Sequence, residues 1–154
     1  MDLKIETATI KSLERLYEIE RLSFLREAFS KQQICYLLAD YNAISIVAKV
    51  EGEIIGFAIG RLEVARGTLW GHIHTLETLP SHRRRGIGER LLRELETLFR
   101  EKGAVESRLE VRENNAAAIE LYKKIGYKRI GRLEKYYGDD HGIYFKKSLM
   151  HREG

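Results

Sequence analysis

The connection between a predicted strand and a predicted helix reads Leu79-Pro80-Ser81-His82-Arg83-Arg84-Arg85-Gly86-Ile87-Gly88. Its two glycines permit a tight turn and let backbone N–H groups approach a ligand closely. The unpaired N–H groups of the helix's first turn, together with the helix dipole, favour an anion there. Three consecutive arginines add positive charge at the same place. The segment is therefore predicted to bind a phosphate or pyrophosphate group.

Other phosphate-binding motifs fit this segment less well. A P-loop requires GxxxxGK[ST], which the sequence lacks. A Rossmann fingerprint follows the first strand and has a third glycine, where this chain has Leu91. A nucleic-acid or nuclear-localisation patch, or simply a basic loop before a helix, fits the segment taken alone. The neighbouring segments must decide between these interpretations of the turn.

The segments on both sides alternate between strand and helix patterns. Period-two alternation and β-branched residues predict strands over 3–7, 43–50, 54–62, 68–79, 105–111, 127–137 and 141–149. Apolar residues at helical spacing predict helices over 9–24, from the N-cap Ser30 onward, from Gly86 to the C-cap Gly103, and over 115–125. This order predicts one mixed α/β domain, a sheet with helices on both faces.

Composition limits the class of protein. The 154 residues are 44% hydrophobic and 32% charged, which is typical of one globular domain. Basic residues are interspersed with 23 acids, so the net charge of +4 does not indicate a nucleic-acid partner. No apolar run reaches the roughly 18 residues of a membrane span, and no signal sequence is evident, so a cytoplasmic location without membrane attachment is expected. The single cysteine, Cys35, excludes an internal disulfide and reads as a small buried hydrophobe.

Two motifs carry a resemblance to a known family. Residues 83–88 match the [Q/R]-x-x-G-x-[G/A] signature, and Leu109-Glu110-Val111-Arg112-Glu113-Asn114-Asn115-Ala116-Ala117-Ala118-Ile119-Glu120-Leu121-Tyr122, then Gly126-Tyr127, follow in the expected order. With them the chain resembles the GNAT superfamily of N-acetyltransferases, and within it the ribosomal-protein alanine N-acetyltransferases and archaeal N-terminal acetyltransferases. The resemblance covers residues 1–154. It implies the single-domain GNAT fold, with a mostly antiparallel sheet of about seven strands, and acetyl-coenzyme A as cofactor.

The resemblance also implies which residues hold the coenzyme. The pyrophosphate would lie against the turn, and backbone groups of the preceding strand would contact the pantetheine arm and the acetyl carbonyl. Asn115, which is also predicted to cap the helix over 115–125, would bind a pantetheine amide. Tyr122 would be the general acid for the thiolate. The implied cofactor-binding residues are Leu76, Thr78, Arg83, Arg84, Arg85, Gly86, Ile87, Gly88, Asn115 and Tyr122.

Direct acetyl transfer also needs a base for the amine. Glu110 is flanked by apolar residues, where a carboxylate is costly without a partner or a task, and relatives place a catalytic residue there. His72 is the alternative base. Strand alternation predicts His72, His74, Leu76 and Thr78 on one face, and Ile73, Thr75 and Glu77 on the other. Two hydrogen-bonded structural histidines fit the pattern equally well. No metal is expected, because the sequence offers no evident third ligand for a His-x-His pair.

The acceptor side is less clearly defined by the sequence. By resemblance, Tyr136 and Tyr137 would line the acceptor groove, and strand alternation would place His74 near the acceptor amine. Phe24, Glu27 and Phe29 are candidates for the opposite wall. Relatives carry a proline in that wall and this chain does not. The predicted acceptor is the N-terminal α-amine of a protein, with a lysine side chain or small amine as alternatives. A non-catalytic acyl-coenzyme A-binding module would need neither Glu110 nor Tyr122. The protein is expected to be a monomer or homodimer, and Glu77 has no assigned role.

Overall fold

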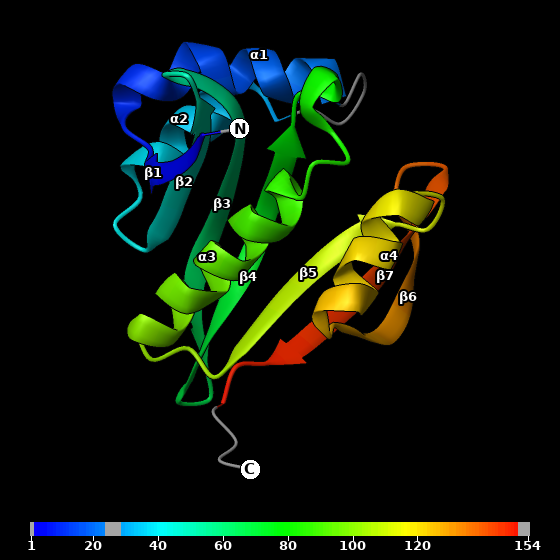
Figure 1. Ribbon diagram of the computed structural model, residues 1–154. Helices are drawn as coiled ribbons and strands as arrows, with labels where there is room; N and C mark the ends of the chain where they lie inside the picture. The colour runs from blue at the N-terminus through cyan, green and yellow to red at the C-terminus, as the bar shows by residue number, and fades with distance from the viewer. Residues whose placement is uncertain (1, 24–28, 151–154) are drawn as a thin grey trace.

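The computed structural model describes residues 2–23 and 29–150, which form one seven-stranded sheet in the order β1-β2-β3-β4-β5-β7-β6 (Figure 1). Among the described strands, only β4 and β5 pair in parallel, so the predicted mixed, mostly antiparallel sheet is confirmed. The strands are β1 (Leu3–Thr7), β2 (Ala43–Val50), β3 (Glu53–Ala65), β4 (Thr68–Thr78), β5 (Glu106–Arg112), β6 (Lys128–Tyr137) and β7 (Asp140–Ser148). The α-helices are α1 (Leu13–Ser23), α2 (Lys31–Ala39), α3 (Ile87–Glu101) and α4 (Ala116–Ile125).

Helices cover both faces of the sheet, as the element order predicted. On one face, Leu16 and Ile19 of α1 and Ile34 of α2 form a buried cluster with residues of β2 and β3. On the other face, α3 and α4 share a larger cluster, and Lys124 of α4 forms an ion pair with Glu89 of α3 at 2.9 Å. Each fully buried Leu or Ile in these clusters contributes about 1.5–3 kcal/mol relative to an exposed one.

Two helix beginnings test the sequence predictions. Ser30 is the N-cap of α2 as predicted, and Ser30 and Gln33 bond each other's backbone N–H groups in a capping box. The predicted helix over 9–24 is instead a 3-10 turn over Ile10–Ser12 followed by α1. Cys35 lies in α2 and is half-buried, so the prediction of a buried side chain is wrong.

The parallel strands β4 and β5 separate soon after they meet. Their register contains two pairs among the described residues, Gly71 with Ser107 and His72 with Arg108, and Figure 1 shows the strands diverging beyond them. The ring of Phe99, from α3, lies over the closed end. A Cβ atom on Gly71 would lie only 2.4 Å from Phe99 Cδ2, so glycine is needed there. The divergence leaves the facing backbone edges of β4 and β5 unpaired by the sheet.

A β-bulge in β4 overturns the predicted strand faces. Ile59 pairs with Thr75 and Gly60 with Ile73, so His74 is an extra residue opposite β3. Ile73 belongs to the α3 cluster, whereas Thr75 donates a hydrogen bond to Glu20 of α1. The extra residue reverses the alternation, which simple period two could not predict. The predicted shared face of His72, His74, Leu76 and Thr78 is therefore wrong: Leu76 and Thr78 face α3, and the histidines face the other way.

Candidate active site

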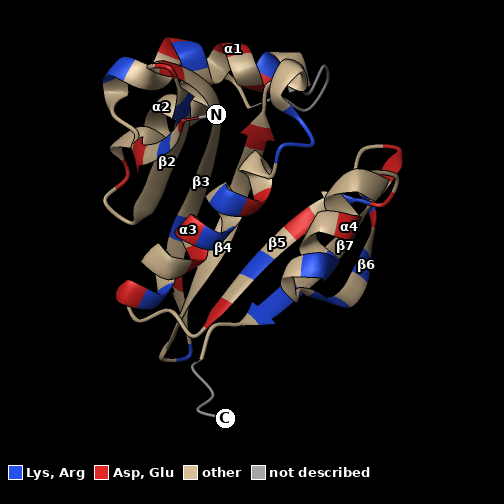
Figure 2. Cartoon of the chain, in the orientation of Figure 1, with Lys and Arg blue, Asp and Glu red and all other residues tan. Residues whose placement is uncertain are grey.

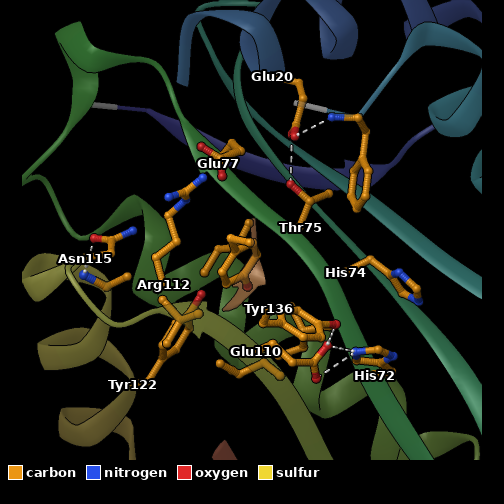
Figure 3. A pocket seen from close by; sticks show the side chains of 17 residues that line it. Glu20, His72, His74, Thr75, Glu77, Glu110, Arg112, Asn115, Tyr122 and Tyr136 are labelled. Carbon is orange, nitrogen blue, oxygen red and sulfur yellow. Dashed lines mark hydrogen bonds and ion pairs between the residues drawn. The ribbon is translucent and has the colours of Figure 1, made fainter. Parts of the chain in front are cut away.

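A cavity of about 400 Å³ fills the split between β4 and β5 (Figure 3). It is lined from both sides of the sheet: Asn115 and Tyr122 come from the α4 region, and Glu20 comes from α1. Nine residues predicted for the site line it, namely Phe29, His72, His74, Leu76, Glu110, Asn115, Tyr122, Tyr136 and Tyr137. The split thus brings together residues that are far apart in the sequence.

The arginine turn lies between β4 and α3, outside the residues that line the cavity. Figure 2 shows its positive charge where β4 leads into α3. Arg83, Arg84 and Arg85 are exposed, and Gly86, the N-cap of α3, has a left-handed φ of 76° with no side-chain cap on the helix. Ile87 is buried in the α3 cluster, so it can offer a ligand only its backbone. An uncapped fifteen-residue helix beside three exposed cations fits a pyrophosphate group.

Glu110 and His72 form an ion pair across β5 and β4. His72 Nε2 lies 2.8 Å from Glu110 Oε1, and Tyr136 Oη donates to the same oxygen at 3.3 Å (Figure 3). The other ring nitrogen, Nδ1, lies 3.3 Å from Glu63 Oε1. Burial disfavours the charged imidazole, but hydrogen bonds to Glu110 and Glu63 outweigh this and raise the pKa of His72. The carboxylate of Glu110, the predicted base, is therefore paired. Both ring nitrogens of His72, the alternative base, lie next to carboxylates.

His74 lies beside His72, with ring centroids 4.5 Å apart. Its Nε2 is buried without a hydrogen-bond partner among the described residues. Burial, with the nearby charge of His72 adding to it, lowers the pKa of His74. The two histidines thus differ: His72 is stabilised in the charged form and His74 in the neutral form.

Tyr122 and Asn115 line the cavity from the α4 side. Tyr122 is 8% exposed, and burial, followed by the charges of Glu77 and Tyr137, raises the pKa of its phenol. Asn115 is the N-cap of α4, because its Oδ1 accepts a hydrogen bond from Ala118 N at 3.1 Å. The predicted cap is confirmed. The amide NH₂ is left as the group of Asn115 that can donate to a ligand.

The predicted acceptor residues are described only in part. Tyr136 and Tyr137 of β6 line the cavity with their rings edge to face at 4.9 Å. Burial, followed by the charge of Glu110, raises the pKa of Tyr136. Phe29 also lines the cavity. Phe24 and Glu27 lie outside the described residues.

Three acidic residues take places that the sequence did not predict. Glu20 is 2% exposed and accepts hydrogen bonds from Thr75 Oγ1 at 2.9 Å and Phe29 N at 3.1 Å. Burial raises the pKa of Glu20. Because Glu20 follows Leu16 by four residues, it lies on the buried face of α1, and this spacing could have indicated its burial from the sequence. Glu63 lies in β3, which continues to Ala65, three residues past its predicted end. Glu77 is 9% exposed, and Figure 3 shows the Arg112 side chain extending toward it.

The cavity joins the two faces of a split sheet. The cationic start of α3 lies on one side, and the Glu110–His72 pair lies on the other. This arrangement is typical of a group-transfer enzyme. The model of the acetyltransferase (GNAT) family matches residues 11–127. The chain belongs to this family and is an acetyltransferase, as its two motifs predicted.

Named relatives agree with this assignment. An N-alpha-acetyltransferase of Sulfurisphaera tokodaii is 33% identical over 93% of this chain and 90% of its own. The N-alpha-acetyltransferase RimI of Mycobacterium tuberculosis is 40% identical over 89% of each chain. The crystal structure of Ard1 from Thermoplasma volcanium superimposes with a TM-score of 0.88, at 28% identity, over 98% of this chain and 100% of that one. Among the described residues, no helix is long and apolar enough to cross a bilayer.

Proposed function

We propose that the protein transfers the acetyl group of acetyl-coenzyme A to the N-terminal α-amine of a protein. The observation that carries this proposal is the Glu110–His72 pair in the split sheet, on the side opposite Tyr122. The cavity could hold a thioester between these two groups, where one can accept a proton and the other can donate one. The relatives named N-alpha-acetyltransferase support the α-amine as acceptor.

Acetyl-coenzyme A supplies the activated acyl group, and the residues present fit it. The exposed turn from Arg83 to Gly88 would hold the pyrophosphate with backbone N–H groups and arginine charge. The unpaired edge of β4 near Leu76 and Thr78 offers backbone groups to an extended, amide-containing arm. Asn115 would donate its NH₂ to an amide carbonyl.

Glu110 is the proposed base. Its carboxylate accepts hydrogen bonds from His72 and Tyr136, which fix its orientation toward the cavity. His72 has both ring nitrogens next to carboxylates, so it has no free lone pair for an incoming ammonium. We therefore assign proton removal to Glu110, directly or through water, and assign His72 to positioning that carboxylate.

Tyr122 is the proposed acid. Its raised pKa keeps the phenol protonated at neutral pH, so it can donate a proton to a departing thiolate. Tyr122 lies on α4, and Glu110 faces the other side of the sheet on β5. The acyl carbon would then lie between the two groups, which suits direct attack without a covalent enzyme intermediate.

The acceptor would enter from the side that carries α1 and α2. Tyr136, Tyr137, His74 and Phe29 form its described walls, and Phe24 and Glu27 are proposed for the remaining wall. A single domain, a monomeric or homodimeric state, a cytoplasmic location and the absence of a nucleic-acid partner stay predictions.

A peptide panel tests the acceptor. Coenzyme A release from acetyl-coenzyme A is measured with peptides that have free N-termini and with matched peptides that are N-terminally blocked and carry an internal lysine. We expect turnover only with the free N-termini, ranked by their first residues. Turnover on the blocked lysine peptides would replace the α-amine with a lysine side chain. If acetyl-coenzyme A binds but neither set turns over, the acceptor is not a peptide.

A further inference from the structure

Three side chains with metal-binding atoms gather on the face of the sheet opposite α3. Glu63 comes from β3, and His72 and His74 come from β4; each is half-buried, and their potential ligand atoms lie within 4.8 Å of one another. Glu63 pairs with Trp70 and Arg61 with His72, so Glu63 projects on the face of His72. His74, two residues after His72, lies on the same side, as strand alternation predicted, and the two ring centroids are 4.5 Å apart. The cluster thus depends on the register of β3 against β4.

One distance within the cluster, that between His72 and Glu63, already suits a small tetrahedral ion. Two ligands at 2.0–2.1 Å from a tetrahedral zinc ion lie about 3.3 Å apart. His72 Nδ1 and Glu63 Oε1 are already 3.3 Å apart. The opposite nitrogen of His72, Nε2, lies 2.8 Å from Glu110. A carboxylate bonded to the outer nitrogen of a metal-binding histidine fixes the tautomer and the ring orientation in zinc sites.

An independent observation concerns His74. Its Nε2 is buried and has no hydrogen-bond partner among the described residues. An unsatisfied buried polar atom is costly, and a bound ion or water is one explanation for it in a native protein. Coordination of a cation by the His74 ring would supply the missing interaction.

We propose that Glu63, His72 and His74 bind a divalent transition-metal ion, with Zn²⁺ as the preferred metal. Two imidazoles and one carboxylate suit zinc better than the hard cations Mg²⁺ and Ca²⁺, which take oxygen ligands. Three protein ligands leave a fourth position for water. Binding displaces any proton on the coordinating nitrogens into solvent.

The metal would have a consequence for catalysis that rests on the proposed function. A dication on Nδ1 of His72, across the ring from the nitrogen that contacts Glu110, would oppose the approach of a positively charged ammonium group to Glu110. Zinc would also hold His72 in one tautomer, with Nε2–H directed at Glu110. We therefore expect Zn²⁺ to inhibit turnover as it fills the site.

Zinc binding is measured on untagged, chelator-stripped protein by competition with a chromogenic chelator, and Co²⁺ replaces Zn²⁺ for visible absorption spectra. We expect one equivalent of Zn²⁺ and the intense absorption of a tetrahedral cobalt site. Because loss of an outer-shell partner alone weakens zinc sites about 10–100-fold, His74→Phe and Glu63→Gln should each weaken binding at least about tenfold. His82→Phe is the matched control, since His82 lies on the arginine turn, and it should bind like wild type.

Circular dichroism and thermal melts confirm that each variant is folded. Absence of stoichiometric Zn²⁺ binding to the wild-type protein, or equal affinity in the folded His74→Phe and Glu63→Gln variants, would overturn the site. Turnover at rising Zn²⁺ is then measured with saturating acceptor peptide. If zinc binds and turnover stays unchanged, only the predicted inhibition is wrong. Failure of the acceptor panel leaves the direct binding measurement unaffected, so the two proposals fail separately.

Discussion

The two sides of the split sheet are built in different ways. The donor side consists of the turn over 83–88 with Asn115 and Tyr122, and most of its ligand-binding groups are backbone N–H groups and exposed cations within two short segments. The acceptor side consists of Glu20, Glu63, His72, His74, Glu110 and Tyr136, which come from five separate elements. The donor side comes from two short local segments, whereas the acceptor side exists only after the sheet has formed.

This contrast predicts that catalysis and coenzyme binding can be separated by mutation. Glu110→Gln removes the proposed base and nearly preserves side-chain size, while the donor side is untouched. General base catalysis contributes about 10²–10⁴-fold, so we expect kcat to fall about a thousandfold while the Kd for acetyl-coenzyme A stays within about twofold. Steady-state kinetics and calorimetric titration measure the two quantities.

Glu106→Gln is the matched control for this variant. Glu106 lies four residues earlier on β5, on the same face, and is paired with Arg108 outside the cavity. It should keep kcat within about threefold of wild type, because its side chain does not line the cavity. Equal losses in both variants would mean that Glu110 acts through the stability of β5, and an unchanged kcat in Glu110→Gln would exclude it as the base.

The same contrast explains what could be read from the sequence. The turn over 83–88 and the N-caps Ser30 and Asn115 are local, so the sequence around them predicted where their helices begin. Glu110 was also identified, because a carboxylate in an apolar strand is unusual. The order of strands and helices was predicted from periodicity, and the structure confirms the mixed sheet.

The acceptor side could not be predicted in full because it depends on register. One extra residue at His74 reversed the faces of β4, and a bulge leaves no reliable mark in a single strand's alternation. Glu63 becomes a neighbour of His72 only through the hairpin at Arg66 and Gly67, whose φ angles are 53° and 77°. The sequence showed the His-x-His pair but not the third potential ligand.

A smaller effect is expected on the donor side. Replacing Arg83 and Arg85 together with Ala removes two exposed cations from the start of α3 but leaves its backbone N–H groups in place. Because solvent screens exposed charges, we expect the Kd for acetyl-coenzyme A to rise only about tenfold, with kcat nearly unchanged. Arg93→Ala, on the next turns of α3 and paired with Glu89, is the control and should bind normally. Unaltered affinity in the double variant would place the pyrophosphate elsewhere.

The smallest effect concerns a buried charge beneath the acceptor side. Glu20 has a pKa above its ordinary value of 4.5, so its ionisation costs folding stability as the pH rises from 4.5 through the folded-state pKa. Thr75→Val removes a hydrogen bond that favours the ionised carboxylate. We therefore expect a loss of about 1–2 kcal/mol of unfolding free energy at pH 8 and a smaller loss at pH 4, measured by urea denaturation.

The exposed Thr68→Val, at the start of β4, is the control for that substitution and should change stability little at either pH. The coenzyme turn carries no buried carboxylate among its described residues, so acetyl-coenzyme A affinity should not follow the pH dependence of the Thr75→Val loss. Equal destabilisation at pH 4 and pH 8 would show that Thr75 contributes through packing alone. In that case the buried charge would not distinguish the acceptor side, and the difference between the two sides would reduce to how far apart their residues lie in the sequence.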